Sequence, residues 1–193
     1  MELTDYQKFT ITDPAQLRSE VKRLDVDVPV SADVSVLASP LAIGDRQLPN
    51  RLCVQPMEGC DAHPDGSPGP LTYRRYTRYA EGGSGLIWME ATAITPAVRS
   101  NPSQLCLHAE TLPAFTQFVS ALREAAAQRG HDPVIILQLA HPGRNCTPPI
   151  LVHHNPVLDA DSGIPSTYPL VTDEELEAIR DSFIAAAWLA AAA

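Results

Sequence analysis

Three short runs of nearly unbroken apolar residues, each followed by a segment with helical spacing, constrain the fold of this chain more than any other feature. The apolar runs are residues 51–57, 85–94 and 133–139. The segments with helical spacing are residues 73–81, 113–129 and 173–187. Strands that alternate with helices pair in parallel through right-handed crossovers. The pattern therefore predicts three βα units in an α/β domain.

Residues at the ends of these helical segments support the assignment. Thr72 is expected to cap the first helix, and Thr111 precedes the second. Gly130 follows the second helix as a stop, because glycine readily adopts the backbone conformation that ends a helix. Thr172 and Glu175 have the spacing of a capping box at the start of the third.

The N-terminal part has a different pattern. Residues 1–38 form a mixed leader, in which Asp13 can cap a short helix. Residues 39–49 have the pattern of a small hairpin with Gly44 at its turn. We therefore expect an N-terminal leader, followed by one domain over residues 39–193. The order of strands and helices fits either a doubly wound sheet or a (β/α)8 barrel.

Charge and cysteine content exclude several classes of partner and location. A surface with a net charge of −9 repels phosphate backbones, so we expect neither nucleic acid nor an anionic membrane as a partner. The chain has no run of eighteen apolar residues, and its first residues lack the basic and apolar regions of a signal peptide. The four cysteines form no C-x-x-C pair, which favours reduced thiols in a cytoplasmic protein.

Polar residues interrupt each apolar run near its end. The first run leads into Gln55 and Glu58, the second contains Glu90, and the third contains Gln138. In both architectures ligands bind beyond the carboxyl ends of parallel strands. Three interruptions on adjacent strands therefore predict a binding site for a polar ligand. No recognised metal-ligand spacing and no nucleophile elbow is present, so we expect neither a metal site nor hydrolase chemistry.

The same segments resemble a known family in the same order. The motifs are P-N-R-L followed by Q-P-M at residues 49–57, G-S-G-L-I followed by E-A-T-A at residues 83–93, and I-L-Q-L-A-H-P-G-R at residues 136–144. They resemble the first three strands of the old yellow enzyme (NADH:flavin oxidoreductase) family, and residues 172–187 resemble the helix before its fourth strand. The resemblance spans residues 36–193.

This resemblance implies the N-terminal portion of a (β/α)8 TIM barrel, with a hairpin and about three βα units. The doubly wound alternative is disfavoured because no glycine-rich fingerprint follows the first strand. A complete barrel needs about 200 to 250 residues or more. We therefore expect the chain to stop before the barrel closes.

The resemblance also implies FMN across the barrel mouth. It assigns the cofactor site to Gln55, Pro56, Met57, Glu58, Ala91 and Gln138. Gln138 would hydrogen-bond the pyrimidine edge, because a carboxamide offers both a donor and an acceptor to the flavin. Ala91 would leave room for the flat ring. The protein's part in such a site is to orient the cofactor and tune its electronics.

Two residues depart from the family pattern. Family members commonly have Thr or Cys, which donates to a flavin carbonyl, where this chain has Glu58. An ionised Glu58 would disfavour a reduced, anionic flavin unless burial keeps it protonated. Cys60 stands where some relatives place a substrate-facing Tyr, so we interpret Cys60 as substrate-facing. The family's substrate-anchoring His-His or His-Asn pair follows the fourth strand, so no catalytic residue is assigned within these 193 residues.

The implied activity is hydride transfer from NAD(P)H through FMN to an activated C=C bond or a related acceptor in a small molecule. The sequence does not choose between NADH and NADPH, and homo-oligomerisation of the full-length protein is compatible with it. We expect the truncated chain to be inactive alone. The alternative hypothesis is a non-catalytic fragment or partner chain that completes a barrel with a second polypeptide.

Several of these polar residues also have structural interpretations. In this interpretation, a neighbouring loop would form the hydrogen bonds of the Gln138 carboxamide. Glu90 lies in a buried run and is expected to pair with Arg99 or Arg144, because buried carboxylates need partners. We favour this structural role for Glu90.

Overall fold

The computed structural model describes residues 10–193. The chain divides into two compact units, and the boundary in the sequence lies between Ser39 and Pro40. The first unit contains helix α1 (Pro14–Arg23) and the short 3-10 helix η2 (Ser35–Ala38). The Asp13 carboxylate accepts hydrogen bonds from two backbone N–H groups in the first turn of α1. The predicted cap is therefore confirmed.

The second unit begins with the predicted hairpin. Strands β1 (Leu41–Ile43) and β2 (Arg46–Leu48) pair antiparallel. Gly44 lies between them with φ +59°, a conformation that glycine adopts without steric cost. The hairpin is therefore confirmed at the predicted place.

A parallel sheet of three strands follows, in the order β3-β4-β5. The strands are β3 (Cys53–Val54), β4 (Leu86–Ala93) and β5 (Val134–Ala140). The three predicted strands are present, but the first is much shorter than residues 51–57. It ends early because the chain turns locally, with the Met57 N–H donating to the Gln55 carbonyl at 2.9 Å instead of to a neighbouring strand.

Helices α2 (Pro70–Glu81) and α3 (Leu112–Gln128) connect the strands, with the 3-10 helix η3 (Pro96–Val98) before α3. The prediction of Thr72 as the cap of α2 was wrong. The helix begins earlier because Pro70 is pre-organised for a first helical position. Thr72 lies in the first turn, and its Oγ1 accepts a hydrogen bond from the Gly69 N–H.

After β5 the chain contains the 3-10 helix η4 (Gly143–Asn145), the short helix α4 (Pro156–Asp161) and the long helix α5 (Asp173–Ala192). The capping box of α5 is confirmed by two reciprocal hydrogen bonds between Thr172 and Glu175. None of the helices in residues 10–193 combines the length and the apolar character that crossing a membrane requires.

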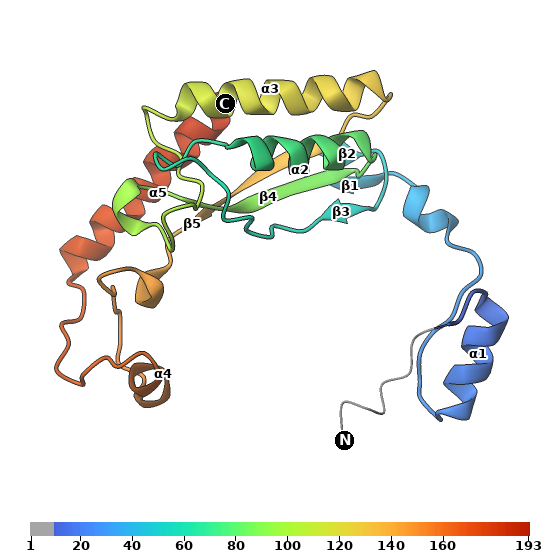
Figure 1. Cartoon of the computed structure of the whole chain (residues 1–193), viewed down its shortest axis with the longest axis horizontal. Coiled ribbons are helices and arrows are strands. Elements are labelled where there is room, and N and C mark those ends of the chain that lie inside the picture. Colours follow the sequence, from blue (N-terminus) through green and yellow to red (C-terminus); the bar gives the residue numbers. More distant parts are fainter. Residues whose placement is uncertain (1–9) are drawn as a thin grey trace. The chain divides into compact units, whose positions relative to one another are not determined.

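Helices α2 and α3 cover one face of the parallel sheet (Figure 1). Tyr76 of α2 and Phe118 of α3 are fully buried there against Ile87 and Met89 of β4. The two rings meet edge to face, with centroids 5.6 Å apart. This cluster is the main core, and it fixes the sheet relative to the helices that precede and follow β4.

Among residues 40–193, no helix covers the opposite face of the sheet, which is called the open face below (Figure 1). Ile135 and Leu137 of β5 pack against the helix-covered core, so the alternating residues point to the other side. Trp88 and its partner Ile136 lie on that side, and each is 39% exposed. Unbroken apolar runs are typical of strands that are buried on both faces. Within the described residues, only the helix-covered face of this sheet is buried.

A β-bulge at Glu90 changes the register near the end of β4. Met89 pairs with Leu137, and the next pair along the ladder is Ala91 with Gln138. Glu90 is the extra residue, which is left without a partner on β5. Ala91 and Gln138 therefore lie side by side on the open face, beyond Trp88.

Candidate functional site

The carboxyl ends of β3, β4 and β5 meet at one edge of the sheet, where the sequence places its polar residues. The structure brings together Ala91 and Gln138, which are register partners at this edge and are both half-buried. The Gln138 carboxamide makes no hydrogen bond to any residue between 10 and 193. No loop within these residues forms a hydrogen bond with it, so its donor and acceptor are available to a ligand there.

The segment after β3 supplies four of the predicted cofactor residues. Pro56 is half-buried, whereas Gln55, Met57 and Glu58 are exposed, and Met57 retains 73% of its accessible surface. The exposed Met57 side chain at the strand ends offers an apolar surface to a ligand. The contact of these residues with a flavin stays a prediction.

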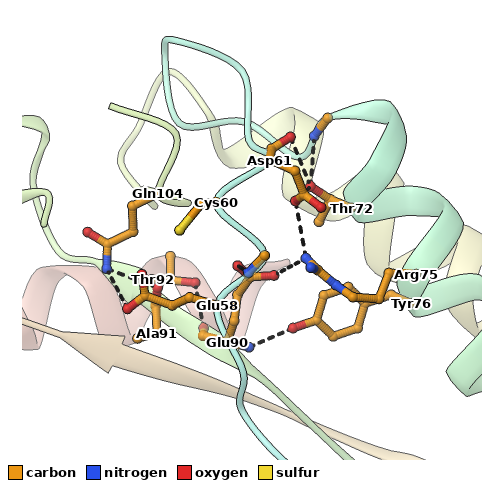
Figure 2. Close-up of polar contacts among 12 residues, drawn as sticks. Glu58, Cys60, Asp61, Thr72, Arg75, Tyr76, Glu90, Ala91, Thr92 and Gln104 are labelled. Atoms are coloured by element: carbon orange, nitrogen blue, oxygen red, sulfur yellow. Dashed lines mark hydrogen bonds and ion pairs between the residues drawn. The ribbon is translucent and has the colours of Figure 1, made fainter. Parts of the chain in front are cut away.

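Glu58 is turned toward the loop that follows β4 (Figure 2). Its carboxylate lies 3.4 Å from Ser100 Oγ and 3.5 Å from both Asn101 Nδ2 and Gln104 Nε2. All three groups can donate hydrogen bonds, and the side chain is exposed. The Glu58 carboxylate therefore lies within reach of three donors on the loop after β4.

Gln104 is a site residue that the sequence did not indicate. Its side chain is almost completely buried. Its Nε2 donates to the Ala91 carbonyl at 3.1 Å, and its Oε1 accepts from the Ser100 N–H at 2.7 Å. It thereby joins the loop after β4 to the strand itself. The only signal in the sequence was a polar residue directly before the apolar run L-C-L at 105–107.

Cys60 has an unusual backbone conformation for a non-glycine residue, with φ +49°. Its thiol is exposed, and Sγ lies 3.5 Å from Asn101 Nδ2. Cys60 and Glu58 therefore both lie beside the loop after β4, at the same edge as Ala91. A role of Cys60 toward a substrate stays a prediction.

Glu90 is buried, and the structure corrects its predicted partner. The carboxylate binds Arg75 of α2, with 2.5 Å between Oε1 and a guanidinium nitrogen, and accepts a hydrogen bond from the Gly59 N–H at 2.8 Å. The predicted partners are engaged elsewhere. Arg99 donates to two backbone carbonyls, and Arg144 forms an ion pair with Asp159.

Burial raises the pKa of the Glu90 carboxyl, while the Gly59 hydrogen bond and the Arg75 charge oppose this shift. The backbone N–H of Glu90 also donates a hydrogen bond to the Tyr76 hydroxyl at 2.7 Å. Burial raises the pKa of the Tyr76 phenol as well. The carboxylate therefore costs free energy at neutral pH, because part of its hydration is lost.

Replacing Glu90 by glutamine is expected to change how stability depends on pH. Because the folded-state pKa is raised, its contribution is present at low pH and is lost as pH rises through that pKa. The free energy of unfolding should therefore fall with rising pH in the unmodified protein relative to Glu90→Gln, by about 1.4 kcal/mol for each unit of the shift. Urea unfolding at a series of pH values from about 4, near the ordinary pKa of a glutamate side chain, up to about 8 measures this difference. Glu110→Gln, at an exposed position, is the control. If the free energy of unfolding of Glu90→Gln and that of the unmodified protein changed with pH in parallel, the expectation would be contradicted.

A family model described as the NADH:flavin oxidoreductase / NADH oxidase family matches residues 36–193. The chain belongs to this family. The family uses FMN as its cofactor, with NADH or NADPH as the co-substrate. The resemblance inferred from the strand motifs is therefore confirmed.

Two curated relatives of this flavin oxidoreductase chain are bacterial NADPH dehydrogenases. That of Listeria welshimeri is 32% identical over 118 residues, which covers 60% of this chain and 33% of the relative. That of Bacillus subtilis is 32% identical over 110 residues, which covers 56% of this chain and 31% of the relative. The chain thus spans about a third of the length of these relatives.

A comparison with a solved structure supports the fold. The old yellow enzyme from a Pichia species superposes with a TM-score of 0.59 at 20% identity, over 80% of this chain and 42% of that one. The likeness supports the fold alone. The parallel βα units of this chain therefore correspond to part of a (β/α)8 barrel, as predicted.

Proposed function

We propose that this chain contributes the first strands of an FMN site in an NAD(P)H-dependent oxidoreductase. The observation that carries the proposal is the pairing of Ala91 with Gln138 on the open face, at the carboxyl ends of β4 and β5. A small residue next to an unpartnered carboxamide suits a flat ring whose edge carries both donors and acceptors.

The residues of this edge would bind and orient the cofactor. Gln138 would hydrogen-bond the ring, Ala91 would leave space for it, and Met57 would cover apolar surface. FMN would supply the redox chemistry, by taking hydride from NAD(P)H and giving it to an activated C=C bond or a related acceptor. The names of the two bacterial relatives favour NADPH as the donor.

Glu58 would place a negative charge beside this site. Its carboxylate is held by the loop after β4 and is exposed, so it would disfavour an anionic reduced flavin. We therefore propose a member of the family with a lower flavin reduction potential than relatives with Thr or Cys at this position. The free thiols of Cys53 and Cys60 are compatible with a cytoplasmic location.

Replacing Gln138 by alanine is expected to weaken FMN binding about tenfold, because the loss of one or two hydrogen bonds is worth about 1–1.5 kcal/mol. The measurement is a titration of the purified chain with FMN, followed by flavin fluorescence. Gln117→Ala is the matched control, because Gln117 is an exposed glutamine on α3, away from the strand ends.

Saturable binding that Gln138→Ala weakens and Gln117→Ala leaves unchanged would support the proposed site. A folded chain that does not bind FMN would contradict the proposal. So would binding that is equally strong in both variants, because Gln138 would then not contact the cofactor.

A further inference from the structure

Gly59 lies between Glu58 and Cys60, and its backbone is held from one side. Its N–H donates to Glu90 Oε2 at 2.8 Å. Glu90 can reach this group because it is the extra residue of the bulge and does not point along the regular alternation of β4. The hydrogen bond links the segment after β3 directly to β4.

The other constraint on Gly59 is steric. A Cβ atom at this position would lie 1.6 Å from a terminal guanidinium nitrogen of Arg75. The φ of Gly59 is outside the left-handed region, so a left-handed backbone is not the reason for glycine here. A side chain at residue 59 would therefore displace the Arg75 guanidinium.

Arg75 is itself fixed by several contacts (Figure 2). One guanidinium nitrogen lies 3.1 Å from Asp61 Oδ1 and 2.5 Å from Glu90 Oε1. The guanidinium carbon lies 5.2 Å from the centroid of the Tyr76 ring. Asp61 also accepts a hydrogen bond from the Thr72 hydroxyl at 2.7 Å. Arg75 therefore ties α2 to both Glu90 and the segment after β3.

From these contacts we propose that Arg75, Glu90 and Gly59 form a positioning unit for the cofactor edge. Arg75 and Glu90 are positioning residues that act through the Gly59 backbone. They fix the chain between Glu58 and Cys60, so that both side chains lie against the loop after β4. The inference rests on the proposed FMN site, since its effect is exerted there.

The test compares Gly59→Ala, Arg75→Met and Arg75→Lys with a matched control. Arg74→Met removes the neighbouring arginine of α2, which is exposed and makes no ion pair with a described residue. Two quantities are measured on the full chain. Amide hydrogen exchange at residue 59 is followed by NMR without FMN, and the FMN dissociation constant is measured by fluorescence. Far-UV circular dichroism shows that each variant is folded.

We expect amide exchange at residue 59 to be about tenfold faster in Arg75→Met. Without the Arg75 contacts, the hydrogen bond between the Gly59 N–H and Glu90 should open more often. FMN affinity should fall about tenfold in Gly59→Ala and Arg75→Met, since misplaced binding groups lose their contacts. Arg75→Lys should retain more FMN affinity than Arg75→Met, because lysine keeps the positive charge but lacks the planar guanidinium that contacts both Asp61 and Glu90. Arg74→Met should match the unmodified chain in both measurements.

Two results would overturn the positioning role. One is unchanged FMN affinity in folded Gly59→Ala and Arg75→Met, which would leave the contacts with a structural role only. The other is unchanged amide exchange in Arg75→Met. Failure of the unmodified chain to bind FMN would instead overturn the proposed function, while the exchange measurement would still report on the contacts themselves.

Discussion

Replacing Ala91 by phenylalanine is expected to abolish measurable FMN binding, with an affinity loss of more than about 100-fold, or about 2.8 kcal/mol. Ala91 pairs with Gln138 on the open face of the sheet, so an aromatic ring at this position would fill the space proposed for the flavin. Fluorescence titration with FMN measures the effect.

The substitution must be separated from general damage by a bulky residue. Ala127→Phe is the control, because Ala127 is exposed near the end of α3 and far along the chain from the strand ends. Ala91→Phe should keep the far-UV circular dichroism of the unmodified chain, since the open face accommodates the ring. Undiminished FMN binding by Ala91→Phe would show that the cofactor does not lie over β4.

Replacing Asn50 by alanine is expected to lower the free energy of unfolding by about 2–3 kcal/mol, because three hydrogen bonds to backbone groups are lost. Its Oδ1 accepts from the N–H groups of Leu52 and Gly85, at 3.0 Å and 2.9 Å, and its Nδ2 donates to the Gly83 carbonyl at 2.8 Å. Asn50 thus joins the starts of β3 and β4.

Urea unfolding measures this effect as a lower transition midpoint with an unchanged slope. Asn145→Ala is the matched control, since Asn145 is exposed and its side chain forms no hydrogen bond in the described part of the chain. Asn50→Asp should be intermediate, because it keeps the acceptor and loses the donor. An Asn50→Ala variant as stable as Asn145→Ala would contradict the proposed role.

Local patterns in the sequence predicted the elements whose determinants are local. Asp13 and the pair Thr172–Glu175 form their caps with residues two or three positions away, and both were predicted correctly. Thr72 was assigned incorrectly because Pro70, two residues earlier, already satisfies the requirements of a first helical position. Two good start signals within one turn cannot be ranked by propensity alone.

The strand motifs identified residues of the candidate site, whereas contacts that depend on packing between elements could not be predicted from the sequence. Gln138 and Ala91 follow from the strand motifs, and the structure places them side by side. The pairing of Glu90 with Arg75 depends on how α2 lies on the sheet. Gln104 reaches Ala91 through a loop whose path no periodicity encodes.

The bulge at Glu90 has a consequence for comparing this chain with its relatives. Without it, strict alternation would place Glu90 on the open face and Ala91 among the helices. One additional residue thus reverses the parity of the last positions of β4. A relative with a regular strand here needs a one-residue gap in its alignment to this chain. Omitting that gap would equate inward-facing positions with outward-facing ones, and would transfer functional assignments to the wrong side chains.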